Sequence, residues 1–198
     1  MRRAIFCSLI LLLPYVLIAQ TKESADANVP SVQAGAEFSI YNPDFYCTSN
    51  SPFSCGNNLP LIKGIGVFAD YNIHNRWGAE GEARWLHWDG VGRQVESTYL
   101  IGPRIRAYSW RRLDLWAKFL LGIGAITTAN YPNPPSLKGT MFVYAPGGSV
   151  DYRLNRRFAV RGDYEQQKWP TFGTGPPHNH SLSPNGFSLG VVYRVWGR

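Results

Sequence analysis

The sequence is poor in charged residues, in cysteine and in long apolar runs, and each shortage excludes a class of protein. Asp, Glu, Lys and Arg make up 17% of the 198 residues, against about 25% in an ordinary soluble domain. A disordered chain is typically rich in charged residues and poor in aromatic ones, so this class is excluded. A coiled coil requires Glu, Lys and Leu at a regular heptad spacing, so it is excluded as well. Three cysteines are too few for a disulfide-framework miniprotein. The 14% of aromatic residues, 20 Gly and 14 Pro instead favour a turn-rich all-β chain.

The longest apolar run lies at the N-terminus. Two arginines precede an apolar stretch that ends at Ala19, an arrangement typical of a secretory signal peptide. The sequence therefore predicts a signal peptide over residues 1–19, cleaved after Ala19, with residue 27 as an alternative site. No later stretch approaches the 18 apolar residues of a transmembrane helix. If the mature protein stays in a membrane, only a closed β-barrel satisfies its backbone there.

Apolar and polar residues alternate with period 2 in eight segments between Val32 and Trp196. The clearest example is the C-terminal one, where five apolar residues share one parity: Phe187, Leu189, Val191, Tyr193 and Val195. Segments of about ten residues suit strands that cross a bilayer at a tilt. The pattern predicts an all-β fold over residues 31–196, an eight-stranded antiparallel up-and-down transmembrane β-barrel. Because proline is disfavoured in a ladder, Pro103 and Pro146 are each expected to mark a bulge or a strand end.

The expected connections alternate between short and long. The short ones lie near residues 72–76, 109–113 and 154–157, and the long ones near 42–60, 89–95, 129–141 and 170–185. Short turns on one side and long loops on the other are typical of an outer-membrane barrel. With eight strands, both termini are then expected on the short-turn, periplasmic side.

The polar parity of these segments carries seven acidic and six basic residues: Glu37, Asp70, Glu80, Glu82, Asp151, Asp163, Glu165, Arg84, Arg104, Arg106, Lys118, Arg161 and Arg194. A soluble barrel would turn these charges outward, and a membrane barrel would turn them into the lumen. The near balance of charge suits pairing in a confined space. Glycines recur on the same parity, and aromatic residues recur near the ends of the apolar parity, as interfacial girdles do. We therefore expect a salt-bridged lumen that closes the barrel to ions.

Five sequence pieces in order resemble the outer membrane protein A/X-like family of eight-stranded barrels, in its "outer membrane protein β-barrel domain" form. They are Trp77-Gly-Ala-Glu-Gly-Glu-Ala-Arg84, Tyr99-Leu-Ile-Gly-Pro-Arg104, Lys118-Phe-Leu-Leu-Gly122, Gly147-Gly-Ser-Val-Asp-Tyr-Arg153 and Phe158-Ala-Val-Arg-Gly-Asp-Tyr164. The resemblance implies a protein of the Gram-negative outer membrane, in contact with its lipid and with the barrel-assembly machinery. It implies no activity, because fold does not give function. Such barrels commonly end in an aromatic assembly signal. Here Trp196 falls on the inward-facing parity of the last segment. The assembly signal is therefore either Trp196 or the outward face that carries Tyr193 and Val195.

Two groups of residues invite a catalytic interpretation. His178-Asn-His180-Ser181 suggests half a metal site or a Ser/His hydrolase, but it lies in a proline-rich loop without an adjacent acid. Glu80 and Glu82 share one face and suggest an acid pair, but basic residues in similar number share that face. We therefore expect no catalytic, cofactor-binding or metal-binding residues and a non-enzymatic role, structural or through the loops toward an unknown extracellular ligand. A lipid-modifying barrel enzyme resembling lipid A deacylase and a narrow, porin-like pore are the alternatives.

The remaining basic residues and cysteines complete the sequence predictions. The formal charge of +7 suggests nucleic acid, but the basic residues outside the strands cluster in short turns, so no nucleic-acid partner is expected and the protein should be a monomer. Cys7 leaves with the signal peptide, and export to an oxidising compartment predicts a Cys47–Cys55 disulfide. The alternative is two free thiols.

Overall fold

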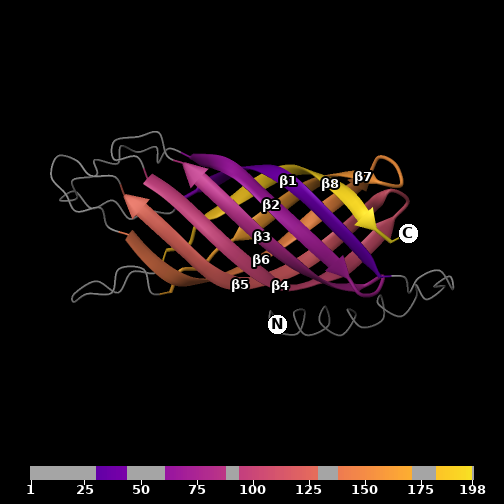
Figure 1. Cartoon of the computed structure of the whole chain (residues 1–198), viewed down its shortest axis with the longest axis horizontal. Helices are drawn as coiled ribbons and strands as arrows, with labels where there is room; N and C mark the ends of the chain where they lie inside the picture. Colours follow the sequence, from indigo (N-terminus) through magenta and orange to yellow (C-terminus); the bar gives the residue numbers. More distant parts are fainter. Residues whose placement is uncertain (1–29, 44–60, 88–93, 129–137, 171–181, 198) are drawn as a thin grey trace, which may run out of the picture.

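The computed structural model describes residues 30–43, 61–87, 94–128, 138–170 and 182–197. Eight strands make up almost all of this part of the chain. They are β1 (Ser31–Asn42), β2 (Ile62–Asn72), β3 (Trp77–His87), β4 (Gln94–Trp110), β5 (Leu113–Thr128), β6 (Lys138–Arg153), β7 (Phe158–Gln166) and β8 (Asn185–Trp196). Each strand pairs antiparallel with the next, and β1 pairs with β8, so the sheet closes on itself. Figure 1 shows the strands tilted against the long axis of the barrel. The predicted eight-stranded antiparallel barrel is confirmed.

The alternation of the sequence becomes an alternation of exposure, because successive side chains of a strand point to opposite faces. Ile65, Ile101 and Phe187 face outward and are 62%, 66% and 68% exposed. Arg84 and Arg104, on the other parity, face inward and are fully buried. An apolar outer surface around a charged interior is the arrangement of a membrane barrel, the reverse of a soluble one. No helix among the described residues is long and apolar enough to cross a membrane.

Aromatic side chains gather on the outer surface near the strand ends. At the short-turn end they include Tyr71, Trp77 and Tyr152, all 44–54% exposed. Toward the other end, the indole Nε1 of Trp85 donates a hydrogen bond of 3.2 Å to the Tyr99 hydroxyl, and the two rings pack edge to face. Aromatic girdles of this kind lie at the two membrane–water interfaces of a barrel.

The connections alternate as predicted. The turns over residues 73–76, 111–112 and 154–157 are short, whereas the strand bounds leave residues 43–61, 88–93, 129–137 and 167–184 for the other connections. Both strand termini of the barrel, the start of β1 and the end of β8, lie at the short-turn end (Figure 1).

Three expectations about local structure were wrong. Pro103 and Pro146 mark neither a bulge nor a strand end: both point outward within uninterrupted strands, and Pro146 stays in register with Phe119. The register shifts instead between Arg106 and Tyr108 on β4, and between Val32 and Gln33 on β1. The second shift lies opposite Trp196, which is therefore 57% exposed and not turned into the barrel.

Candidate functional site

Four cationic side chains lie inside the barrel with no more than 1% of their surface exposed: Arg84, Arg104, Lys118 and Arg161. They come from β3, β4, β5 and β7, so they reach the lumen from different parts of its wall. An interior of eight strands is just wide enough for side chains to fill. Unpaired charges buried at this depth are strongly destabilising, and each of the four is surrounded by carboxylates.

Arg84 forms the part of this cluster nearest the long connections. Its Nη2 lies 3.0 Å from Glu37 and 2.6 Å from Glu82, and its Nη1 lies 3.1 Å from Glu165. The same guanidinium donates to the Tyr41 hydroxyl and lies 4.7 Å from the centre of the Tyr41 ring. One arginine thus joins strands β1, β3 and β7 across the lumen.

Lys118 occupies the centre. Its Nζ lies 2.8 Å from Glu80, 3.2 Å from Glu82, 2.9 Å from Asp163 and 3.4 Å from Glu165. A primary ammonium has only three protons to donate, so the four carboxylates share one compact charge. Glu82 and Glu165 also contact Arg84, which makes the two groups continuous.

Arg104 and Arg161 hold the part nearest the short turns. Arg161 lies 2.7 Å from Asp70, 2.7 Å from Asp151 and 3.4 Å from Glu80. Arg104 contacts the same three carboxylates, at 3.1 Å for Glu80 and 3.4 Å for Asp151. The four cations and seven carboxylates therefore form one network, the lumen network, to which every strand from β1 to β7 contributes.

Besides the Tyr41 ring against Arg84, two further aromatic rings cover guanidinium groups of the lumen network. The Arg104 guanidinium carbon lies 4.0 Å from the centre of the Trp116 ring, and that of Arg161 lies 4.2 Å from the centre of the Phe68 ring. Cation–π contacts of this kind gain strength when water is excluded. In the sequence, Phe68 and Trp116 occupy positions that alternate with the outward-facing apolar residues of their strands. This alternation could have assigned both to the lumen.

The seven predicted acidic residues and six predicted basic residues are not distributed evenly along the barrel. All seven predicted acidic residues belong to the lumen network, but only four of the six predicted bases do. Arg106 lies at the short-turn end, 3.5 Å from Asp114, and Arg194 has no ion pair with any described residue. Acidic residues thus outnumber basic ones in the middle of the barrel, and unpaired or partly paired basic residues collect at its short-turn mouth.

Toward the long connections the interior includes a cluster of apolar side chains, although the inward-facing residues were expected to be polar throughout. Leu100, Leu120, Val143, Trp169 and Leu182 belong to one buried cluster there. The Trp169 indole fits against Gly124, where an added Cβ would lie 2.2 Å from the ring. Its Nε1 donates to Gln167, whose Nε2 donates to Glu165, so hydrogen bonds link the apolar cluster to the lumen network.

Two buried carboxylates were missed because the strands extend further than the alternation suggested. Glu96 lies on β4 and is 5% exposed, and neither of its carboxylate oxygens has a hydrogen-bond partner in the described part of the chain. Asp114 is the second residue of β5 and accepts hydrogen bonds from Ser109 (2.6 Å) and Arg106. Both residues lie two positions before a predicted inward-facing residue, Glu96 before Thr98 and Asp114 before Trp116. Extending each predicted strand by two residues would have assigned both to the interior.

Some predicted residues lie outside the part of the chain that the structure describes. They are Cys47, Cys55, His178, His180 and Ser181, together with residues 1–19. The disulfide and the signal peptide therefore remain predictions.

A closed barrel with an apolar belt, aromatic girdles and an ion-paired interior defines an integral membrane protein of the outer-membrane type. The sequence matches the family described as "Outer membrane protein beta-barrel domain" over residues 9–194. The chain belongs to this family and is a β-barrel of the Gram-negative outer membrane. No curated protein matches the chain significantly.

Solved structures share the fold at low sequence identity. Neisserial surface protein A is 11% identical with a TM-score of 0.57, and the match covers 85% of this chain and 97% of that one. OprG from Pseudomonas aeruginosa is 12% identical with a TM-score of 0.53, covering 85% and 96%. Ail, the attachment invasion locus protein of Yersinia pestis, solved in complex with the heparin analogue sucrose octasulfate, is 17% identical with a TM-score of 0.51, covering 84% and 97%.

Proposed function

We propose that this protein is a closed, non-enzymatic scaffold of the outer membrane, which holds its four long connections outside the cell as a structural or ligand-binding surface. One observation carries the proposal: the lumen network ties seven strands together across the interior, with its cations no more than 1% exposed. An interior held together in this way favours a closed lumen, and it engages the predicted inward carboxylates in ion pairs.

Two further features support the closed form. The buried apolar cluster around Trp169 lies between the lumen network and the long connections. Every carboxylate of the lumen network, including the pair Glu80 and Glu82, lies within 4 Å of at least one buried cation. Both members of that pair are held in ion pairs, Glu80 with Lys118, Arg104 and Arg161, and Glu82 with Lys118 and Arg84.

The proposed orientation places the short turns in the periplasm and the long connections outside. The proposal includes export with removal of residues 1–19, insertion by the barrel-assembly machinery, and a monomer surrounded by outer-membrane lipid. Ail in complex with sucrose octasulfate is a precedent for ligand binding by a barrel of this fold. Mass spectrometry of the mature protein checks the cleavage site, since cleavage after Ala19 and after Ala27 give different masses.

Planar-bilayer recording of the pure wild-type monomer tests the closed lumen. We expect no steady, large conductance, and brief openings in Lys118→Ser, which removes the central cation. Arg76→Gln is the matched control, because Arg76 is exposed in the turn after β2 and outside the lumen network. Steady conductance from the wild type would contradict the scaffold and favour the pore. A deletion strain assayed together for envelope permeability, adhesion and lipid A composition tests the role of the loops; altered lipid A alone would favour an enzyme.

A further inference from the structure

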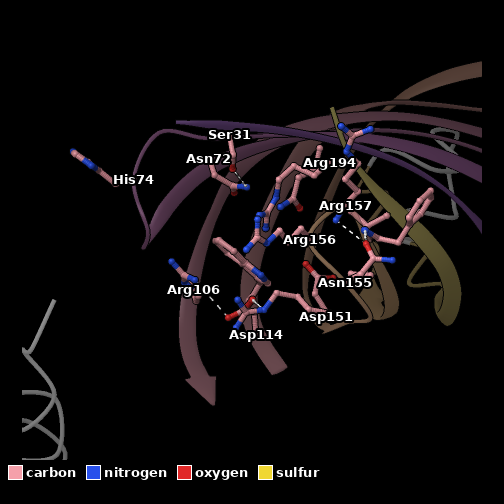
Figure 2. A pocket seen from close by; sticks show the side chains of 16 residues that line it. Ser31, Asn72, His74, Arg106, Asp114, Asp151, Asn155, Arg156, Arg157 and Arg194 are labelled. Atoms are coloured by element: carbon pink, nitrogen blue, oxygen red, sulfur yellow. Dashed lines mark hydrogen bonds and ion pairs between the residues drawn. The ribbon is translucent and has the colours of Figure 1, made fainter. Parts of the chain in front are cut away.

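The short-turn mouth of the barrel contains a cavity of about 200 Å³, whose lining includes five arginines: Arg106, Arg153, Arg156, Arg157 and Arg194. Figure 2 shows Arg106, Arg156 and Arg194 among the side chains around it, and Trp116 and Asp151 also line it. We propose that this cavity is a binding site for a small phosphate-bearing anion. The proposal does not depend on whether the lumen conducts, because the cavity lies at the mouth of the barrel, next to the lumen network.

The arginines are not all neutralised from within the protein. The two carboxylates in the lining already have partners: Asp114 contacts Arg106 and Arg153, and Asp151 belongs to the lumen network. Arg156, Arg157 and Arg194 have no ion pair among the described residues. The cavity therefore concentrates positive charge that an external anion can balance.

The backbone around the cavity holds these arginines in place. Asn155 Oδ1 accepts hydrogen bonds from the backbone N–H groups of Arg157 (2.8 Å) and Phe158 (2.9 Å), which fixes the turn between β6 and β7. The Arg194 N–H donates to the Arg157 carbonyl at 2.8 Å, which ties the end of β8 to that turn. Arg157 and Arg194 are thus held beside each other despite their like charge (Figure 2).

Unused hydrogen-bond donors line the same cavity. Trp116 is 6% exposed, and its Nε1 has no hydrogen-bond partner in the described structure; the same holds for Arg194 Nε. A buried donor without a partner costs free energy, and an anion oxygen is the partner that these N–H groups fit. One acceptor, Asn72 Oδ1, is also unpartnered, and it can accept a hydrogen bond from a protonated oxygen of inorganic phosphate.

The groups that line the cavity suit a phosphate. Guanidinium groups bind phosphate and carboxylate oxygens in bidentate pairs, and three of them with an indole N–H match the several oxygens of a phosphate. A cavity of about 200 Å³ is smaller than the sites of drug-sized ligands, so the occupant is a free phosphate or the phosphate of a lipid headgroup.

Isothermal titration calorimetry of the folded barrel tests the site. The probe is inorganic phosphate, and the control is chloride at equal ionic strength. The barrel is kept in a maltoside detergent because this detergent carries no phosphate. We expect saturable phosphate binding, weakened about tenfold in both Arg157→Gln and Arg194→Gln, since a charge-assisted hydrogen bond contributes about 1.4 kcal/mol or more. Arg76→Gln, in a turn outside the cavity lining, should bind as the wild type does. A shift between boiled and unboiled samples on a gel verifies that each variant is folded.

Nanodiscs containing phosphatidylglycerol distinguish the two sources of phosphate. If a headgroup fills the cavity, the lipid competes with added phosphate, and mass spectrometry finds retained phosphatidylglycerol that Arg157→Gln loses. If the ligand is free phosphate, added phosphate binds equally in detergent and in nanodiscs. Absence of saturable binding in the wild type, or an equal loss in Arg76→Gln, would overturn the proposal.

Discussion

Arg161 on β7 lies with its Nη2 2.7 Å from Oδ2 of Asp70 on β2, although these two strands do not pair. The contact crosses the lumen and joins walls that are separated along the sheet by β8 and β1. A hydrogen-bonded ladder holds only neighbouring strands together, whereas ion pairs such as this one brace the barrel from within. The lumen network thus adds a second set of links to the closed sheet.

Removing Arg161 should destabilise the barrel. Arg161→Met leaves Asp70 and Asp151 short of a cation, and we expect a loss of roughly 3 kcal/mol, the lower end for a broken buried pair. Urea unfolding in detergent measures it. The exposed-turn variant Arg76→Met should change stability by less than about 0.5 kcal/mol. The double variant Arg161→Met with Asp70→Asn should lose less than the two single changes summed; strict additivity would show that the contact contributes nothing.

A methyl group at Gly124 should be poorly tolerated. The added Cβ would lie 2.2 Å from the Trp169 indole, and overpacking of this kind costs about 1–3 kcal/mol. Gly124→Ala should therefore unfold at lower urea concentration than the wild type. Gly81→Ala and Gly162→Ala are matched controls, because an added Cβ at either site meets no atom within 4 Å. Equal effects at all three positions would mean that strand glycine itself, and not the packing of Trp169, sets the cost.

The barrel should keep its fold in SDS until it is heated, because a closed sheet has no edge from which to unravel and its interior is ion-paired. Boiled and unboiled samples should migrate differently on a gel, and circular dichroism should show β structure in detergent. A helical spectrum, or a folded soluble chain without detergent, would be incompatible with the membrane barrel.

Cys47 and Cys55 should form a disulfide in the exported protein. In the chain-entropy account, a loop of about nine residues stabilises the fold by about 2.5 kcal/mol. Thiol labelling of the unfolded, unreduced mature protein should find no reactive cysteine, and labelling after reduction should find two. Two reactive thiols before reduction would refute the bridge.

The sequence by itself determined the barrel and, Trp196 apart, which strand residues share a face. Parity grouped them, because the side chains of a strand alternate strictly and one residue of slip would reverse every one of them. The balanced charges and the aromatic girdles then indicated the membrane arrangement, with the charged face inside. The sequence therefore assigned Glu37, Asp70 and Lys118 to the interior, and Ile65 and Phe187 to the surface, as the structure does.

Only the tertiary structure decided which interior residues meet. Which inward residues share a level depends on strand tilt and register, and these are set by the closure of the whole sheet. Hence Arg84 and Arg161 belong to the lumen network, while Arg106 and Arg194 lie at the mouth. The alternation of the sequence assigns all four to the inward face and does not predict how far along the barrel each one lies. The apolar cluster around Trp169 depends likewise on a connection that returns to the barrel. Alternation along one strand carries no information about contacts between strands that never pair.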